Sequence, residues 1–409
     1  MRLQLDLTKE YGLVLEGGGA KGAYQIGAWK ALKEAGVKIK GISGVSVGAL
    51  NGAMICMDDL EKAEQIWDNI SYSQVMDVDD EQMEMLTRRD LKNLNLNNVV
   101  QDALKVVKDR GVDVTPLKNM IADLCDERVI RHSEIEFYIV TYSLSDLRLI
   151  DICAKEVPQG LIPDMLLASA YLPVFKREKL HGKHYMDGGG WDRVPIDSLI
   201  TRGYENIIVL RIHGWGIEKP VKIPEHVAVT DIAPRQDLGG ILEFDAVRSR
   251  KNMQLGYFDA QKVLYGLAGE DYYLDMSLTE EEAYARLVSM GKRYLQVEAK
   301  RSEQKAEQKT ESRIEKTLEK LAEKKSDLRR IHEDLLPEMA KKFLKNRSWT
   351  YGELYVKWLE QVALGYEIPV FVIYTEKQLL EQIAQKRQQY ASEGRIQPEY
   401  DIYLSEISF

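Results

Sequence analysis

The sequence of 409 residues has few cysteines, no excess of positive charge and no long apolar run. Its three cysteines, Cys56, Cys125 and Cys153, lie far apart without C-x-x-C spacing. This pattern fits a reducing compartment better than a disulfide framework, and none of the cysteines has metal-site spacing. The formal net charge of -9 gives no global attraction to nucleic acid or to anionic lipid. No segment reaches the ~18 apolar residues that a membrane-spanning helix needs.

The N-terminal stretch lacks a basic region followed by an apolar one, so it does not have the form of a secretory signal. Hydrophobic residues make up 44% of the chain and charged residues 30%, which is close to the composition of globular domains. The length is sufficient for two or three domains. We therefore expect a soluble, cytoplasmic protein that has no nucleic-acid partner.

The chain opens with alternating strand and helix patterns. Residues Tyr11–Leu15 form a short apolar run that ends in three glycines, and a helical pattern follows until Gly36. A second strand is predicted over Val37–Ile42, and Val47–Met57 is apolar enough for a buried helix. This βαβα order predicts an α/β fold around a parallel sheet that is covered on both faces.

The remainder of the chain becomes more helical and more charged. Later strands are predicted over residues 135–142, 147–153, 207–212 and 369–374, and helices over 242–267 and 376–390. Residues 298–334 are dominated by Glu, Lys, Arg and Gln with spaced leucines, which fits a short coiled coil, a helical hairpin or a solvated surface helix. The polar segment 71–126 carries Met76, Met83 and Met85 and is a candidate lid or lipid-contacting surface, although methionines more often fill a small core.

Three glycine-rich motifs carry the chemistry: GGGAKG at Gly17–Gly22, GVSVG at Gly44–Gly48 and DGGG at Asp187–Gly190. The first also fits G-x-G-x-x-G after a strand, which is the fingerprint of a dinucleotide-binding loop. That function requires an acidic residue at the end of the second strand, but Ser43 and Gly44 stand there. The nucleotide interpretation therefore lacks its ribose-binding residue.

The same glycines suit an oxyanion hole, in which backbone N–H groups face the oxygen that becomes negative during acyl transfer. Loops that follow neighbouring parallel strands meet at one edge of a sheet, so the first glycine loop and Ser46 are expected to be neighbours. Gly44 and Gly48 flank Ser46 and would let backbone pass closely, as at a nucleophile on a strand-to-helix turn. Lys21 would add charge near the site or pack its stem over the turn.

A serine hydroxyl needs a base that removes its proton. In the chain order typical of α/β hydrolases, Asp187 would be followed by His213 or His226, and His213 at a strand end is the better histidine. Asp187 lies in a turn of three glycines that leaves room for a ligand or another backbone, but an isolated Asp-Gly pair more often makes a simple Asx turn. The residues alone leave the base open.

Taken in order, the three motifs resemble those of the patatin-like phospholipases, and the stretches ASAYLPVF at residues 168–175 and DGGGWDRVP at residues 187–195 strengthen the match. The resemblance covers about residues 11–212. It implies a three-layer sandwich with a mainly parallel central sheet, and a Ser–Asp dyad without histidine, in which Ser46 is the nucleophile and Asp187 the base. It further assigns the following residues to the oxyanion hole and the DGG motif: Gly17, Gly18, Gly19, Lys21 and Gly22, with Gly188 and Gly189.

One departure concerns the exit from the third motif. The family frequently has an asparagine before the proline that follows DGG, whereas this chain has Asp192-Arg193-Val194-Pro195. We expect an acyl hydrolase domain over residues 1–275 and a helical, charge-rich region with a late strand over 276–409.

The resulting prediction is a serine acyl hydrolase that cleaves ester bonds of lipids, with a phospholipid or lysophospholipid as substrate and with no cofactor or metal. A nucleotide-binding protein that uses the Gly17–Gly22 loop and a non-catalytic patatin-like scaffold are the alternatives. Contact with a membrane surface, and self-association or partner binding through the C-terminal helices, are left open by the sequence.

Overall fold

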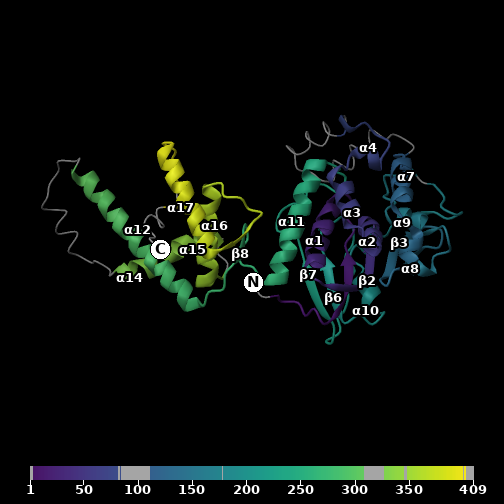
Figure 1. Cartoon of the computed structure of the whole chain (residues 1–409), viewed down its shortest axis with the longest axis horizontal. Helices are drawn as coiled ribbons and strands as arrows, with labels where there is room; N and C mark the ends of the chain where they lie inside the picture. Colours follow the sequence, from purple (N-terminus) through teal and green to yellow (C-terminus); the bar gives the residue numbers. More distant parts are fainter. Residues whose placement is uncertain are drawn as a thin grey trace. The chain divides into compact units, whose positions relative to one another are not determined.

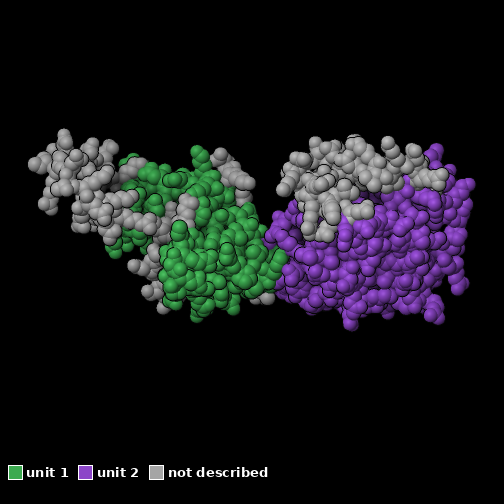
Figure 2. Space-filling model, turned by 90° about the horizontal axis from the view of Figure 1, so that it is seen from above, with its two compact units in different colours: residues 1, 267–409 green, residues 2–266 purple. Residues whose placement is uncertain are grey.

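The computed structural model describes residues 3–81, 83, 111–176, 178–307, 327–344, 348–398 and 400–401. The chain divides into two compact units, Arg2–Gly266 and Leu267–Phe409, which are coloured separately in Figure 2. The domain boundary that the sequence predicts, after residue 275, lies nine residues later in the chain than the division after Gly266. The segment between them belongs to the C-terminal unit because its strand β8, Tyr273–Asp275, pairs with β9, Ile373–Thr375.

The N-terminal unit is built on one sheet, to which seven of the described strands contribute, in the order β4-β3-β2-β1-β6-β7 with β5 paired to β3. The strands are β1 Glu10–Leu15, β2 Lys38–Val45, β3 Glu136–Ser143, β4 Arg148–Cys153, β5 Tyr185–Asp187, β6 Asn206–Leu210 and β7 Ala228–Ile232. The pairs β1–β2, β1–β6, β2–β3 and β6–β7 are parallel, whereas β4 and β5 run antiparallel to β3. The predicted α/β class with a mainly parallel sheet is confirmed.

Helices cover both faces of this sheet. The helical segments of the unit are η1 Gly19–Gly22, α1 Ala23–Glu34, α2 Val47–Met57, α3 Leu60–Asp68, α4 Tyr72–Val75, α7 Thr115–Leu124, α8 Glu127–His132, η2 Ala154–Glu156, α9 Ile162–Ser169, η3 Gly188–Gly190, α10 Ile196–Ile200 and α11 Ala246–Tyr265. Figure 1 labels most of these elements and shows α1 and α11 side by side.

The alternation of side chains along the strands assigns the helices to faces. Paired strand residues point to the same face, and successive residues point to opposite faces. Ile42 and Phe137 are paired across β2 and β3, and both lie against Gly52 of α2. Val14 and Val209 are paired across β1 and β6, and both belong to the buried cluster that includes residues of α10. The sheet therefore lies between two helical layers, as the three-layer prediction requires.

The C-terminal unit is mostly helical. Its described helical segments are α12 Glu280–Glu307, α14 Asp327–Arg330, the π-helical turn η4 Ile331–Leu335, α15 Leu336–Leu344, α16 Tyr351–Gly365 and α17 Glu376–Ser392. They enclose a separate core that includes Tyr272, Trp358 and Tyr366. Of the charge-rich segment 298–334, residues 308–326 lie outside the described part, as does Met85 of segment 71–126. In the parts of the chain that the structure covers, no helix has both the length and the hydropathy of a membrane span.

Candidate active site

Ser46 occupies a tight turn between β2 and α2. It is the residue between Val45, the last of the strand, and Val47, the first of the helix, and its backbone has φ 56° and ψ -130°. A non-glycine residue adopts such values only at a strained position that its surroundings hold in place. Its N–H donates to the hydroxyl of Ser169 at 2.8 Å, and only 5% of the residue is exposed. The turn therefore presents the hydroxyl of Ser46 in a fixed direction.

The two glycines beside Ser46 allow close backbone contacts. A Cβ at Gly44 would lie 2.4 Å from the carbonyl oxygen of Gly48, and a Cβ at Gly48 would lie 2.3 Å from that of Leu15. Both distances are far below an ordinary contact, so any larger residue would force strand and helix apart. The serine turn depends on glycine at both positions.

Asp187 reaches Ser46 through the sheet. It ends β5 and is paired with Thr141 of β3, next to Val140, which is paired with Val45. Its carboxylate accepts a hydrogen bond from the Gly189 N–H at 2.8 Å and one from the side chain of Ser46. Burial raises the pKa of Asp187 to about 6, although both hydrogen bonds act in the opposite direction. Two residues that are 141 positions apart in the sequence thus form one polar pair.

Histidine takes no part in this pair. All six histidines lie among the described residues, and none makes a hydrogen bond with Ser46 there. His213 instead follows β6 with a positive φ of 48°, and its N–H donates to Glu16. The structure therefore does not bring His213 to Ser46 as the base that the chain order of α/β hydrolases suggests.

The glycine loop after β1 lies directly against Ser46. A Cβ at Gly17 would lie 3.2 Å from Cβ of Ser46 and 3.1 Å from the carbonyl oxygen of Val45. The N–H of Gly17 already donates to the carbonyl of Arg193 at 3.0 Å, and that of Lys21 donates to Gly18 at 3.3 Å. Within the described residues, the N–H groups of Gly18 and Gly19 have no acceptor. Two unpaired donors therefore remain in the loop that faces the serine turn.

Lys21 and Gly22 lie beside the site and contact the segments next to Ser46. The half-buried ammonium of Lys21 donates to the carbonyl of His213 at 2.8 Å, and burial lowers its pKa. A Cβ at Gly22 would lie 2.4 Å from Cγ2 of Val47. Lys21 thus holds a loop, and Gly22 permits the first glycine loop to pack against the start of α2.

Ser169 is a structural partner to which the sequence analysis gave no role. Its hydroxyl accepts from the Ser46 N–H and donates to the carbonyl of Val140 at 2.6 Å, and the residue is fully buried. It thereby ties the serine turn to β3. The sequence did contain a signal for this role, namely a serine inside the apolar stretch ASAYLPVF. A buried hydroxyl usually has a hydrogen-bond partner, so such a serine indicates a structural contact.

An apolar cavity of about 80 Å³ has Ser46 among its lining residues. It is lined by Gly19, Ser46, Val47, Leu50, Asn51, Ala53, Met54, Met57, Ile66, Trp67, Ile70, Val75, Leu117, Met120, Ile121, Leu124, Cys125, Leu166, Ala170, Leu172, Phe175 and Phe244. These residues come mainly from α2, α3 and α7, and most of them have apolar side chains. Such a cavity excludes charged ligands and suits a hydrocarbon chain whose polar end lies at Ser46.

The family model described as patatin-like phospholipase matches residues 13–200, a range that holds the glycine loop, Ser46 and Asp187. Residues 13–200, less than half of the chain, therefore match the patatin-like phospholipase family. The predicted resemblance to patatin-like phospholipases is therefore confirmed over these residues. In the described part of the chain, no group of three or more His, Cys, Asp or Glu residues could hold a metal ion.

Curated proteins share a short stretch with this patatin-like chain. Neuropathy target esterase sws of Drosophila sechellia and that of Drosophila persimilis are each 57% identical over 47 residues, which is 12% of this chain and 3% of each relative. Among solved structures, VipD from Legionella pneumophila is similar at a TM-score of 0.39 and 15% identity, over 62% of this chain and 66% of its own. The type III effector ExoU is similar at a TM-score of 0.30 and 15% identity, over 97% of this chain and 76% of its own.

Proposed function

We propose that this protein is a serine acyl hydrolase that cleaves carboxylic esters of lipids through a Ser46–Asp187 dyad. The observation that carries the proposal is the hydrogen bond between the side chain of Ser46, which lines an apolar cavity, and the buried carboxylate of Asp187. A hydroxyl, a base in contact with it and a binding space for a substrate are the elements that covalent ester hydrolysis needs.

The two side chains have complementary tasks. The Asp187 carboxylate takes the hydroxyl proton as the Ser46 oxygen attacks the ester carbonyl, and a base with a pKa of about 6 is mostly ionised at neutral pH. The protonated Asp187 then returns the proton to the leaving alcohol, and an acyl-serine remains. Asp187 takes a proton from a water molecule, which attacks the acyl-serine. The acyl–oxygen bond then breaks, the acid is released, and Asp187 returns the proton to the Ser46 oxygen. The N–H groups of Gly18 and Gly19 are the proposed donors to the oxyanion.

The apolar cavity supports a substrate with a long hydrocarbon chain. A charged headgroup would lose its hydration in such a space without gaining a partner, so the proposal assigns the cavity to the acyl chain. The name of the family points to phospholipids, and that of the curated relatives to esters. We therefore propose phospholipids or lysophospholipids as substrates, with the headgroup outside the cavity.

A reactive phosphonate and a set of variants test this proposal. The full-length chain should react with a fluorophosphonate at Ser46 and should hydrolyse esters. Ser46→Ala should abolish both the labelling and the hydrolysis, and Asp187→Asn should abolish the hydrolysis. Ser43→Ala is a matched control, because this buried hydroxyl three residues away has no hydrogen-bond partner among the described residues. Asp192→Asn is the second control, because burial raises the pKa of this carboxyl to about 6 as well.

Either result is informative about the alternatives. Absence of both hydrolysis and labelling in the wild-type chain, over a panel of phospholipids, lysophospholipids and short esters, would contradict the enzyme and leave the non-catalytic scaffold. Stabilisation by a nucleotide with an unreactive Ser46 would support the nucleotide-binding alternative.

A further inference from the structure

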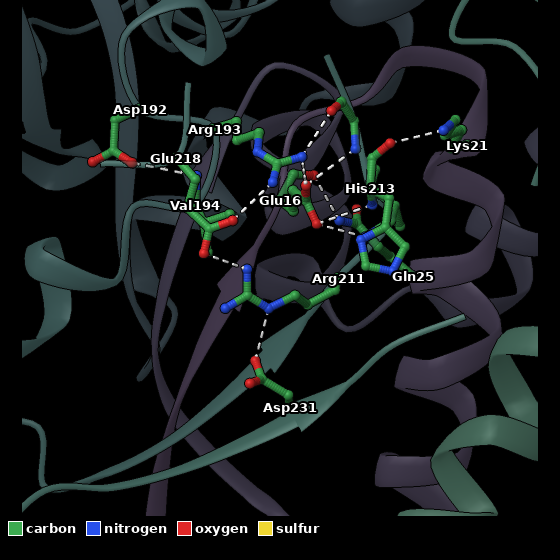
Figure 3. Close-up of polar contacts among 12 residues, drawn as sticks. Glu16, Lys21, Gln25, Asp192, Arg193, Val194, Arg211, His213, Glu218 and Asp231 are labelled. Atoms are coloured by element: carbon green, nitrogen blue, oxygen red, sulfur yellow. Dashed lines mark hydrogen bonds and ion pairs between the residues drawn. The ribbon is translucent and has the colours of Figure 1, made fainter. Parts of the chain in front are cut away.

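A carboxylate is buried directly beneath the glycine loop. Glu16 lies between the last residue of β1 and Gly17, and none of its surface is exposed. Its carboxylate accepts from the backbone N–H groups of Ile212 at 2.7 Å, His213 at 3.1 Å and Gly214 at 3.0 Å. Figure 3 shows these contacts around Glu16. One side chain thus fixes three successive residues of the loop that follows β6.

The counterion of Glu16 is Arg193, which lies in the Asp192–Pro195 exit of the third motif. The guanidinium Nη1 of Arg193 lies 3.0 Å from Oε1 of Glu16 and donates to the carbonyl of Gly214 at 2.8 Å (Figure 3). The Arg193 backbone carbonyl accepts the Gly17 N–H at 3.0 Å. Arg193 therefore holds the glycine loop with its backbone and the neighbouring loop with its side chain.

The two loops are in direct backbone contact. A Cβ at Gly214 would lie 1.8 Å from the carbonyl oxygen of Gly17 and 2.8 Å from Cα of Gly18. Lys21 adds a hydrogen bond from the glycine loop to the carbonyl of His213. Residues 212–214 therefore cannot move toward the glycine loop without displacing Gly17 and Gly18, because no space separates them.

We propose that Glu16 and Arg193 are positioning residues for the oxyanion hole: their ion pair fixes the 212–214 loop against Gly17, so that the Gly18 and Gly19 N–H groups point at the reacting oxygen. Neither side chain touches the reacting atoms. Burying an ion pair is costly unless further hydrogen bonds satisfy its charges, and here three backbone N–H groups satisfy the carboxylate of Glu16. This inference rests on the proposed hydrolase function and adds to it the residues that orient the donors.

The decisive experiment separates the stabilisation of an oxyanion from the stability of the fold. Glu16→Gln keeps the shape and one acceptor oxygen but removes the charge. In the full-length chain we expect its kcat on a water-soluble p-nitrophenyl ester to fall about 10- to 100-fold with little change in KM. The affinity for a trifluoromethyl ketone, which forms an oxyanion on Ser46, should fall by a similar factor, while binding of a free fatty acid should not change.

The ion-pair partner and a control complete the design. Arg193→Gln should lower kcat by a similar factor, and Arg193→Lys should lower it less. The double variant that combines Glu16→Gln and Arg193→Gln should lower kcat no more than the worse of the two single variants, because the two residues act as a unit. Asp231→Asn is the control, since Asp231 pairs with Arg211 in the same network at 2.9 Å but has no contact with the glycine loop in the structure (Figure 3). Its kcat should stay within twofold of wild type.

The failures are distinguishable. A wild-type chain without hydrolysis or labelling refutes the proposed function and, with it, this inference. An active wild-type chain whose Glu16→Gln variant has a lower Tm but an unchanged kcat and ketone affinity, both corrected for the titrated fraction of active sites, refutes the positioning role and leaves a structural ion pair.

Discussion

The backbone of Ser46, the proposed nucleophile, is strained. Its φ of 56° and ψ of -130° are values that glycine adopts freely and that cost other residues about 1–3 kcal/mol. The strain persists because β2, α2 and the hydrogen bond to Ser169 fix the turn on all sides. We infer that the nucleophile position reduces the stability of the fold.

This inference predicts different outcomes for two inactive variants. Ser46→Gly and Ser46→Ala both remove the hydroxyl, but only glycine relieves the backbone strain. We expect Ser46→Gly to exceed Ser46→Ala in free energy of unfolding by about 1 kcal/mol, measured by chemical denaturation. The matched pair for comparison is Ser169→Gly against Ser169→Ala, in helix α9, where the order should be reversed because glycine is unfavourable in helices. Equal stabilities of the two Ser46 variants would contradict the strain.

The raised pKa of Asp187 predicts the pH dependence of hydrolysis. A general base works only when ionised, so kcat/KM should fall as the pH decreases through about 6, the pKa to which burial raises this carboxyl. His213→Gln should keep the same acidic limb. A histidine variant that abolished this limb while Asp187→Asn retained activity would overturn the assignment of the base.

The raised pKa of Asp187 also predicts that the fold becomes more stable when the charge of this side chain is removed. The folded state binds the Asp187 proton more tightly than the unfolded state, so stability is lost as the pH rises from about 3.8 to about 6. A rise in pKa from 3.8 to about 6 corresponds to about 3 kcal/mol as an upper bound. Asp187→Asn should therefore be more stable than wild type at pH 8 by about 1–3 kcal/mol and equal to it near pH 4. Denaturation at both pH values tests this, with exposed Asp123→Asn as a control that should show no such difference.

The residues that the sequence could supply are those whose local pattern is unusual. Ser46 and Asp187 stand in glycine-rich turns, and their order along the chain produced the family resemblance. Glu16 and Arg193 gave no such signal, and Ser169 gave only a weak one as a polar residue in an apolar stretch. Their roles come from contacts with segments that are far away in the sequence, such as the loop at 212–214 around Glu16, and one sequence does not reveal those contacts.

At the scale of elements, α1 and α11 cross with almost no space between their backbones. A Cβ at Gly27 would lie 1.8 Å from the carbonyl oxygen of Met253, and one at Gly256 would lie 1.9 Å from that of Tyr24. Such an approach requires glycine on both helices, in spite of its low helix propensity. The crossing also sets the position of α1, which begins directly after the glycine loop.

Gly256→Ala should therefore separate the two helices. We expect a loss of at least about 2 kcal/mol in the free energy of unfolding, although alanine is the better helix former. Lys251→Ala, an exposed position on the same helix, is the control and should change stability by less than about 0.5 kcal/mol. An unchanged or increased stability of Gly256→Ala would show that the helices can move apart at little cost.

The limits of the elements were predictable where the pattern itself marks them. The predicted helix Val47–Met57 coincides with α2, because a strained turn begins it and a left-handed residue, Asp58, ends it. The predicted strand 369–374 differs from β9, Ile373–Thr375. Its partner β8 has three residues, and a strand extends only as far as it is paired. Partners of this kind lie a hundred residues away and cannot be inferred from local hydropathy.

At the scale of the whole molecule, the site belongs to one unit. Ser46, Asp187, the glycine loop and every residue that lines the cavity lie before Gly266. Gly266 ends α11 with a left-handed backbone at φ 63°, and the C-terminal unit has its own core. Each unit thus has the features of a domain that folds by itself.

A chain that ends at Gly266 should therefore remain an enzyme if the proposed function is correct. We expect its kcat/KM on a water-soluble ester to lie within about threefold of that of the full-length chain, with a single thermal unfolding transition, because the sheet, both helical layers and the cavity are retained. The same shortened chain with Ser46→Ala is the control for background hydrolysis. On phospholipid vesicles the comparison asks a separate question, namely whether residues 267–409 bring the enzyme to its substrate. A selective loss on vesicles would assign them that task, whereas a shortened chain that folds but no longer reacts with a fluorophosphonate would mean that the C-terminal unit is needed to complete the site.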